Sequence, residues 1–92
     1  MSRLDQQQRD ELTTTLPEWK VDGEVLRRTF EFSNFTAAMG FVTKVAILAE
    51  KANHHPDIDI RWNKVTLALT THDEGGLSDK DVDLATTIRS VI

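Results

Sequence analysis

All three histidines of this 92-residue chain lie close together in its second half. His54 and His55 are adjacent, in the run Ala-Asn-His-His-Pro, and His72 follows the run Leu-Thr-Thr. Histidine can donate or accept a proton near neutral pH, and it is also a common metal ligand. The concentration of every imidazole in one region therefore indicates a site for proton transfer or for a metal ion.

Each histidine also has a structural explanation. His54 and His55 can lie at the end of a long helix, where a protonated imidazole interacts well with the helix dipole, with Pro56 terminating the helix. His72 has the opposite parity to the apolar residues of its predicted strand, so it can be an exposed strand-end residue. Pairing of the last two predicted strands would bring His72 toward the end of the long helix. Three imidazoles could then surround one cleft and exchange protons there.

A metal site is the weaker alternative. Adjacent residues rarely both point at one ion, and the sequence has no His-x-x-x-His or Glu-x-x-His spacing. Acidic side chains that could complete a ligand set are Glu50, Asp57, Asp59 and Asp73. These histidines and carboxylates are the only support for an alternative function as a small metal-dependent hydrolase. We therefore expect no metal and no organic cofactor.

Composition limits the remaining classes of function. Residues 1–92 fit a single domain. The net charge of −4 and the single adjacent basic pair, Arg27-Arg28, argue against direct nucleic-acid binding. The lack of cysteine excludes disulfides and thiolate chemistry. The polar amino terminus has no secretory signal, and no segment reaches the roughly 18–20 apolar residues of a membrane span, so we expect a cytoplasmic protein.

Local patterns predict the order α-β-β-α-β-β-α. The predicted elements are a helix with a capped start at Ser2–Asp5 that ends before Pro17, strands at Glu18–Val21 and Glu24–Phe32 around an Asp22-Gly23 turn, a helix from Ser33 or Asn34 to about Ala52, strands at Asp57–Trp62 and Lys64–His72, and a last helix capped by Ser78. Strand pairs joined by short turns imply an α+β fold, with a four-stranded antiparallel sheet and helices on one face.

The long predicted helix carries more apolar surface than one sheet requires. One stripe consists of Phe35, Ala38, Met39, Val42, Val45, Ala46 and Ala49, and a neighbouring stripe of Ala37, Phe41, Leu48 and Ala52. Together they span roughly 200° of the helix, whereas packing on one sheet needs little more than 100°. The excess predicts that Phe41 and Leu48 meet another subunit.

Seven positions at set spacings form one pattern: Glu50-x3-His54-His55-Pro56-x5-Trp62-x9-His72-x8-Asp81. This pattern resembles the signature of pterin-4a-carbinolamine dehydratases. The resemblance extends over essentially the whole chain, through Trp19-Lys20, Phe30-x-Phe32-x-x-Phe35, the run from Met39 to Ala46, Asn63-Lys64-Val65 and Gly76-Leu77-Ser78.

The resemblance implies a pterin substrate and a hydro-lyase, a 4a-hydroxytetrahydrobiopterin dehydratase. Its product is a quinonoid dihydropterin, so the activity would recycle the cofactor of aromatic amino-acid hydroxylases. The resemblance assigns proton transfer to His54 and His72, and binding and orientation of the pterin mainly to His55. It places Trp62, Asp81 and Glu50 around the substrate, the two carboxylates chiefly orienting imidazoles.

Residues of the pattern also have structural explanations. Ser78 and Asp81 have the Ser-x-x-Asp spacing of a helix capping box. A tryptophan such as Trp62 usually lies in a core or an interface, and Glu50 can simply belong to the solvated end of the long helix.

The resemblance further implies a homodimer or homotetramer. Animal members of the family are also dimerisation cofactors of a homeodomain transcription factor. The alternative function is therefore a protein-interaction module that acts through its oligomer helix.

Overall fold

The computed structural model describes residues 3–92, and within them the elements follow the predicted order. The helices are α1 (Gln6–Thr15), α2 (Phe35–Ala52) and α3 (Asp79–Ile88), with short 3-10 helices η1 (His72–Glu74) and η2 (Arg89–Val91). The strands are β1 (Lys20–Asp22), β2 (Val25–Glu31), β3 (Asp57–Arg61) and β4 (Lys64–Leu69). No helix in this part of the chain is long and apolar enough to cross a membrane.

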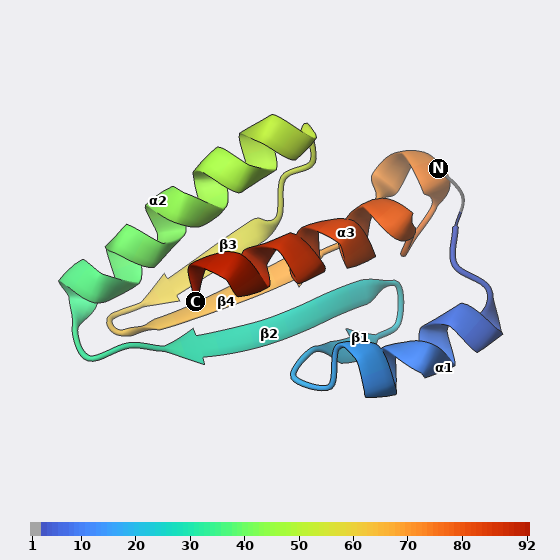
Figure 1. Cartoon of the computed structure of the whole chain (residues 1–92), viewed down its shortest axis with the longest axis horizontal. Coiled ribbons are helices and arrows are strands. Elements are labelled where there is room, and N and C mark those ends of the chain that lie inside the picture. The colour runs from blue at the N-terminus through green and yellow to red at the C-terminus, as the bar shows by residue number, and fades with distance from the viewer. Residues whose placement is uncertain (1–2) are drawn as a thin grey trace.

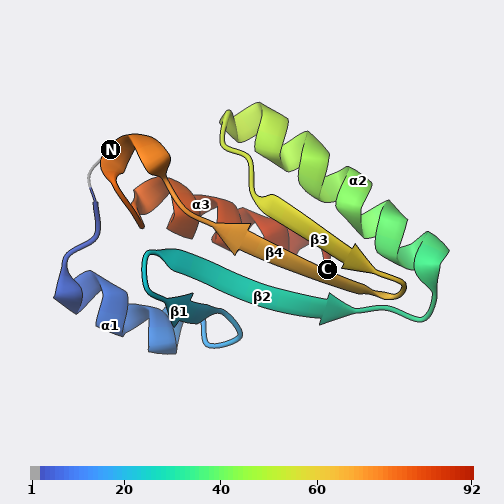
Figure 2. The same cartoon turned by 180° about the vertical axis from the view of Figure 1, so that it is seen from behind.

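The four strands form one antiparallel sheet in the order β1-β2-β4-β3. α3 lies across one face of the sheet, and α2 runs beside it on the side of β3, as the two opposite views show (Figures 1 and 2). α1 lies at the β1 end (Figure 1). The predicted α+β fold, with a four-stranded antiparallel sheet, is confirmed.

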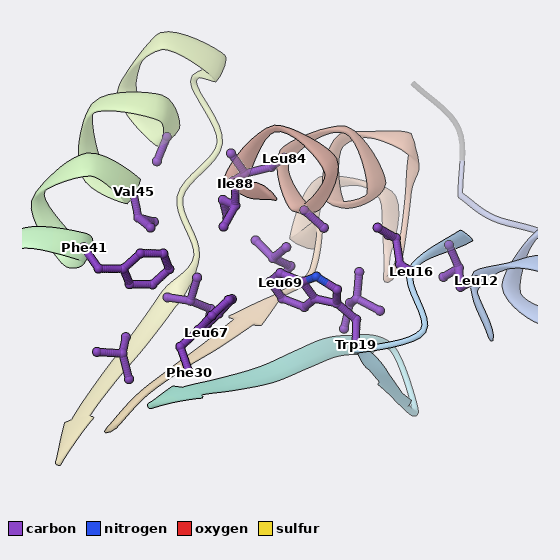
Figure 3. Close-up of a cluster of buried hydrophobic side chains, with 14 of the residues drawn as sticks. Leu12, Leu16, Trp19, Phe30, Phe41, Val45, Leu67, Leu69, Leu84 and Ile88 are labelled. Carbon is purple, nitrogen blue, oxygen red and sulfur yellow. The ribbon is translucent and has the colours of Figure 1, made fainter. Parts of the chain in front are cut away.

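The core lies between the sheet and the helices, as Figure 3 shows. Alternate residues of β2 and β4 face it, which is the period of two expected for a half-buried sheet: Leu26, Phe30, Val65, Leu67 and Leu69. Aromatic rings then bridge the layers, because the ring centroids of Phe30 and Phe41 are 4.7 Å apart. This packing connects the middle of α2 to the centre of the sheet.

Helix ends lie where local sequence placed them. Asn34 caps α2 by accepting a hydrogen bond from the amide of Ala37. Asp5 is the N-cap of α1, with Gln8 completing a capping box, so the helix begins at Gln6, at the end of the predicted Ser2–Asp5 start, whereas Ser2 lies outside the described residues. α1 ends at Thr15, two residues before Pro17, as expected from the restriction that proline places on the preceding residue.

The first hairpin turns one residue later than predicted. Asp22 pairs with Val25, so the two loop residues are Gly23 and Glu24 rather than Asp22 and Gly23. Gly23 takes the positive φ of 60° that the first loop position requires. Glu24 is held outside the ladder because its carboxylate accepts hydrogen bonds from Arg3, Arg9 and the Leu77 amide. The Arg3 hydrogen bond, with the Leu77 amide, lowers the pKa of Glu24.

Two later strands are shorter than predicted. β3 ends at Arg61, because Trp62 has a φ of 53° and turns the chain into β4. β4 ends at Leu69, and His72 begins η1 rather than closing the strand. The reason is a local loop in which Thr71 and Gly76 exchange backbone hydrogen bonds, so that the chain folds back after the strand.

The prediction that Phe41 faces another subunit is wrong. Phe41 is 4% exposed, and its ring lies between those of Phe30 and Phe32 in the core of its own chain. Leu48 is half-buried and packs against the same core. The buried face of α2 takes residues from both predicted stripes, Ala38, Val45 and Ala49 from the first and Phe41 from the second, whereas Phe35 of the first stripe is 50% exposed.

Candidate active site

His54 is placed by the way α2 ends. Asn53 adopts the left-handed conformation, with a φ of 53°, and closes the helix. The amide of His54 then donates to the carbonyl of Ala49, which holds the residue against the last turn. As a result, the imidazole is largely buried, with 11% of the side chain exposed.

Asp81 is the partner of His54, and it comes from the start of α3. Its Oδ1 lies 2.6 Å from Nε2 of His54, and the carboxylate is completely buried. Asp81 also completes the predicted capping box, because its Oδ2 accepts the amide of Ser78 at 3.0 Å. One side chain therefore both starts a helix and orients an imidazole.

A third hydrogen-bond partner completes the surroundings of this carboxylate. The hydroxyl of Thr71 donates to Asp81 Oδ2 at 2.8 Å and lies 2.7 Å from the hydroxyl of Ser78. Within the described residues, no buried side-chain nitrogen or oxygen lacks a hydrogen-bond partner. The burial of Asp81 is thus fully compensated by hydrogen bonds, as a buried charge requires.

His55 has a different environment from its neighbour. Its Nε2 lies 2.7 Å from Oε1 of Glu50, one turn back along α2, but 57% of the imidazole side chain and 79% of the Glu50 side chain are exposed. Exposed ion pairs contribute little to stability, about 0–1 kcal/mol. Glu50 can therefore orient His55 while leaving it free to meet a ligand.

The three histidines line one cavity of about 220 Å³. Its walls are the end of α2, the loop after β4 and the start of α3, and its lining residues are Asn53, His54, His55, Thr70, Thr71, His72, Asp73 and Lys80. The sequence-based expectation that His72 approaches the helix end is therefore met. We call this space the histidine cavity.

A larger cavity, of about 490 Å³, shares His54 and Lys80 with the histidine cavity. It lies between α2 and α3, and its other lining residues are Leu48, Lys51, Ala52, Asp83, Leu84 and Thr87. His54 thus borders two adjoining spaces, one polar and one largely apolar.

Trp62 is not brought to the histidines within one chain. It lies in the β3–β4 turn with 68% of its surface exposed. The five residues of β3 separate that turn from the histidine end, a length of about 17 Å at the usual rise of a strand. Any pterin contact from Trp62 would have to come from another subunit.

Of the acidic candidates for a metal site, Asp73 lines the histidine cavity and Glu50 contacts His55. In residues 3–92, no group of three or more histidines and carboxylates is arranged to hold a metal ion. Asp57 and Asp59 instead border a separate hollow over β3 and β4, with Thr66 and Ala68. The hydrolase alternative therefore gains no support from the geometry.

Sequence reasoning missed Thr71 and Lys80. Thr71 shares the parity of the buried Val65, Leu67 and Leu69 and is itself 3% exposed. A hydroxyl on the apolar side of a strand was the available signal that a buried polar partner exists. For Lys80 the sequence offers no comparable signal, because a lysine in the first turn of a helix is usually solvated.

Comparison with known proteins gives a consistent assignment. The family model described as pterin 4 alpha carbinolamine dehydratase matches residues 2–91. A relative from Acidobacterium capsulatum, named for this dehydratase, is 51% identical over 92 residues, the full length of both chains. A relative of the same name from Roseiflexus sp. strain RS-1 is 52% identical over 91 residues, which are 99% of this chain and 98% of the relative.

Two solved structures resemble the fold. One, from Brucella melitensis, is described as a transcriptional coactivator/pterin dehydratase; it has a TM-score of 0.91 and 35% identity over 98% of each chain. The other is described as a pterin dehydratase-like protein that is a RuBisCO assembly factor in the alpha-carboxysome. It has a TM-score of 0.66 over 79% of this chain and 84% of its own, and at 19% identity it supports the fold alone.

Proposed function

Since the chain belongs to the pterin-4a-carbinolamine dehydratase family, we propose that it dehydrates 4a-hydroxytetrahydropterin to a quinonoid dihydropterin. One observation carries this proposal: all three imidazoles line a single cavity, and one of them is held by a buried carboxylate. Such an activity would return the pterin to a form that can be reduced again, and so recycle the cofactor of aromatic amino-acid hydroxylases.

The proposed reaction needs two proton transfers. The bond between C4a and the hydroxyl oxygen breaks, and a proton delivered to that oxygen lets it leave as water. N5 loses its proton, and the electron pair of that N–H bond forms the double bond between N5 and C4a. General acid and base groups contribute about 10²–10⁴-fold to such steps, and imidazoles can supply both without a metal or organic cofactor.

We assign these transfers to His54 and His72, which both line the histidine cavity. Nε2 of His54 is engaged by Asp81, so its other ring nitrogen, Nδ1, is the one available to a substrate. Within residues 3–92 every buried side-chain nitrogen has a hydrogen-bond partner, and none is found for Nδ1 of His54. This nitrogen is therefore accessible to solvent. His55, oriented by Glu50, binds the pterin, and Asp81 acts through His54.

The test is a dehydratase assay on freshly generated 4a-carbinolamine, with protein that has been treated with a chelator. We expect the full rate after chelation, and a large loss in His54→Ala. Loss of activity that zinc restores would refute the proposal and favour a metal-dependent enzyme. No acceleration over the spontaneous dehydration would refute it as well.

We also propose that the chain forms homodimers or homotetramers through the outer stripe of α2, which we define as Phe35, Met39, Val42 and Ala46. These residues lie on one side of the helix, next to its buried face. Phe35 is 50% exposed, Ala46 is exposed, and Met39 and Val42 are partly accessible, so the stripe is an apolar surface of the kind that marks association sites. A second copy presenting the same stripe would form a self-complementary contact.

A protein-interaction module remains the second candidate function. It is favoured by the description of the Brucella melitensis structure as a transcriptional coactivator as well as a pterin dehydratase. An assembled protein that binds no pterin and dehydrates none would support this candidate instead.

A further inference from the structure

The hydroxyls of Thr71 and Ser78 form a closed chain behind the histidine cavity. Thr71 Oγ1 has two short contacts, 2.8 Å to Asp81 Oδ2 and 2.7 Å to Ser78 Oγ. A hydroxyl carries one proton, and an ionised carboxylate can only accept. The Thr71 proton therefore goes to Asp81, and Ser78 must donate its own proton to Thr71.

These hydrogen bonds determine which atoms of Asp81 and His54 carry a proton. Oδ2 accepts two hydrogen bonds, one from the Thr71 hydroxyl and one from the Ser78 amide, so both lone pairs of this oxygen are engaged. Oδ1 then faces Nε2 of His54 at 2.6 Å and can only accept from it. Nε2 must carry the hydrogen, and Nδ1 is left as the free nitrogen.

The side chains of this network are shielded from solvent. Thr71 is 3% exposed, and both Ser78 and Asp81 are 0% exposed. Buried networks of this kind are rigid when every member is satisfied. Thr71 also directly precedes His72, and its backbone is tied to Gly76 in both directions. The same residue thus connects the carboxylate behind His54 to the peptide that carries His72.

We propose that Thr71 and Ser78 are positioning residues that keep the proton on Nε2 of His54, so that Nδ1 faces the substrate as the proton-exchanging atom. The catalytic part of this inference rests on the proposed dehydratase function. The tautomer of His54 does not, because it can be observed in the free protein.

The experiment measures the imidazole ¹⁵N spectrum of histidine-labelled protein at alkaline pH, where the neutral tautomers are distinguished. The test variant is Thr71→Val, which removes the hydroxyl and keeps the shape. Thr29→Val is the matched control, because Thr29 also pairs with a second hydroxyl, Thr66 at 2.8 Å, away from the histidine cavity. Thr71→Ser restores the hydroxyl and should restore the wild-type behaviour.

We expect His54 to be the Nε2–H tautomer in wild type, in Thr29→Val and in Thr71→Ser. In Thr71→Val the Nδ1–H tautomer should become populated, and kcat should fall about tenfold with little change in KM, the effect of losing one hydrogen bond to a charged group. Wild-type spectra and kcat in folded Thr71→Val would overturn the proposal.

Two further outcomes separate the positioning role of Thr71 from the proposed dehydratase function. If Thr71→Val does not fold, the wild-type spectrum still decides, because a substantial Nδ1–H population of His54 there would overturn the proposal. If the wild type has no dehydratase activity, the proposed function fails. The tautomer comparison between Thr71→Val and Thr29→Val still tests the positioning role on its own.

Discussion

Replacing Phe41 by alanine should destabilise the fold of the subunit rather than dissociate an oligomer. The ring is 4% exposed and lies 4.7 Å from Phe30 and 4.9 Å from Phe32, measured between centroids. Truncation of a buried Phe to Ala typically costs about 3–5 kcal/mol, because the lost burial and the cavity left behind both contribute. A domain of this size has about 5–15 kcal/mol of stability in total. The melting temperature should fall by about 12–40 °C.

Phe35→Ala is the matched control, being the same substitution six residues earlier on the same helix. Half of Phe35 is already exposed within the subunit, so its truncation should cost one subunit about 1 kcal/mol. Its effect on assembly should be larger, since a two-fold contact contains the change twice. We therefore expect Phe35→Ala to dissociate the oligomer and Phe41→Ala to destabilise the fold.

Urea unfolding and sedimentation velocity, each over a range of protein concentrations, separate these effects. The loss of stability in Phe41→Ala should be the same at every concentration, whereas that in Phe35→Ala should depend on concentration through the coupling of assembly and folding. The reasoning would be refuted if Phe41→Ala lost less than about 1 kcal/mol and sedimented as a smaller species, because Phe41 would then belong to an interface.

Further predictions concern the cavity and the first hairpin. His54→Ala and His72→Ala should mainly lower kcat, whereas His55→Ala should mainly raise KM, as measured by steady-state kinetics; wild-type values in all three would mean that the histidines are structural. Trp62→Ala should leave KM unchanged, because the side chain lies at the far end of β3; a raised KM would show that another subunit supplies it. The Arg3 hydrogen bond lowers the pKa of Glu24, so the stability it adds is present at neutral pH and is lost as the pH falls through the lowered value. Glu24→Gln should therefore unfold more easily than wild type at pH 7, and the difference in urea midpoint should shrink in acid.

Sequence alone determined the order of the elements and the caps of α2 and α3, because these caps depend on groups a few residues apart. The Asn34 cap needs only the amide of Ala37, and the capping box of α3 needs only Ser78 and Asp81. The spacing of the histidines was equally informative, since the family pattern is a property of the sequence. These caps could be predicted because donor and acceptor lie within three residues of each other along the chain.

Tertiary structure decided which residues of the two apolar stripes on α2 are buried. Helical period relates Phe35 to Val42 and Phe41 to Leu48, but it contains no information on which of these residues meet the sheet. The buried residues come from both stripes: Ala38, Val45 and Ala49 from the first, and Phe41 from the second. Phe41 is buried because its ring packs on those of Phe30 and Phe32, which come before the helix in the chain.

Tertiary structure also decided the second role of Asp81 and the role of Thr71. Local spacing identified Asp81 as a capping residue, and that is correct, but its contact with His54 spans 27 residues along the chain. Thr71 reaches the same carboxylate from the end of β4. Such contacts form only after the sheet and helices have packed, and the reason they must form is the cost of burying a charge without partners.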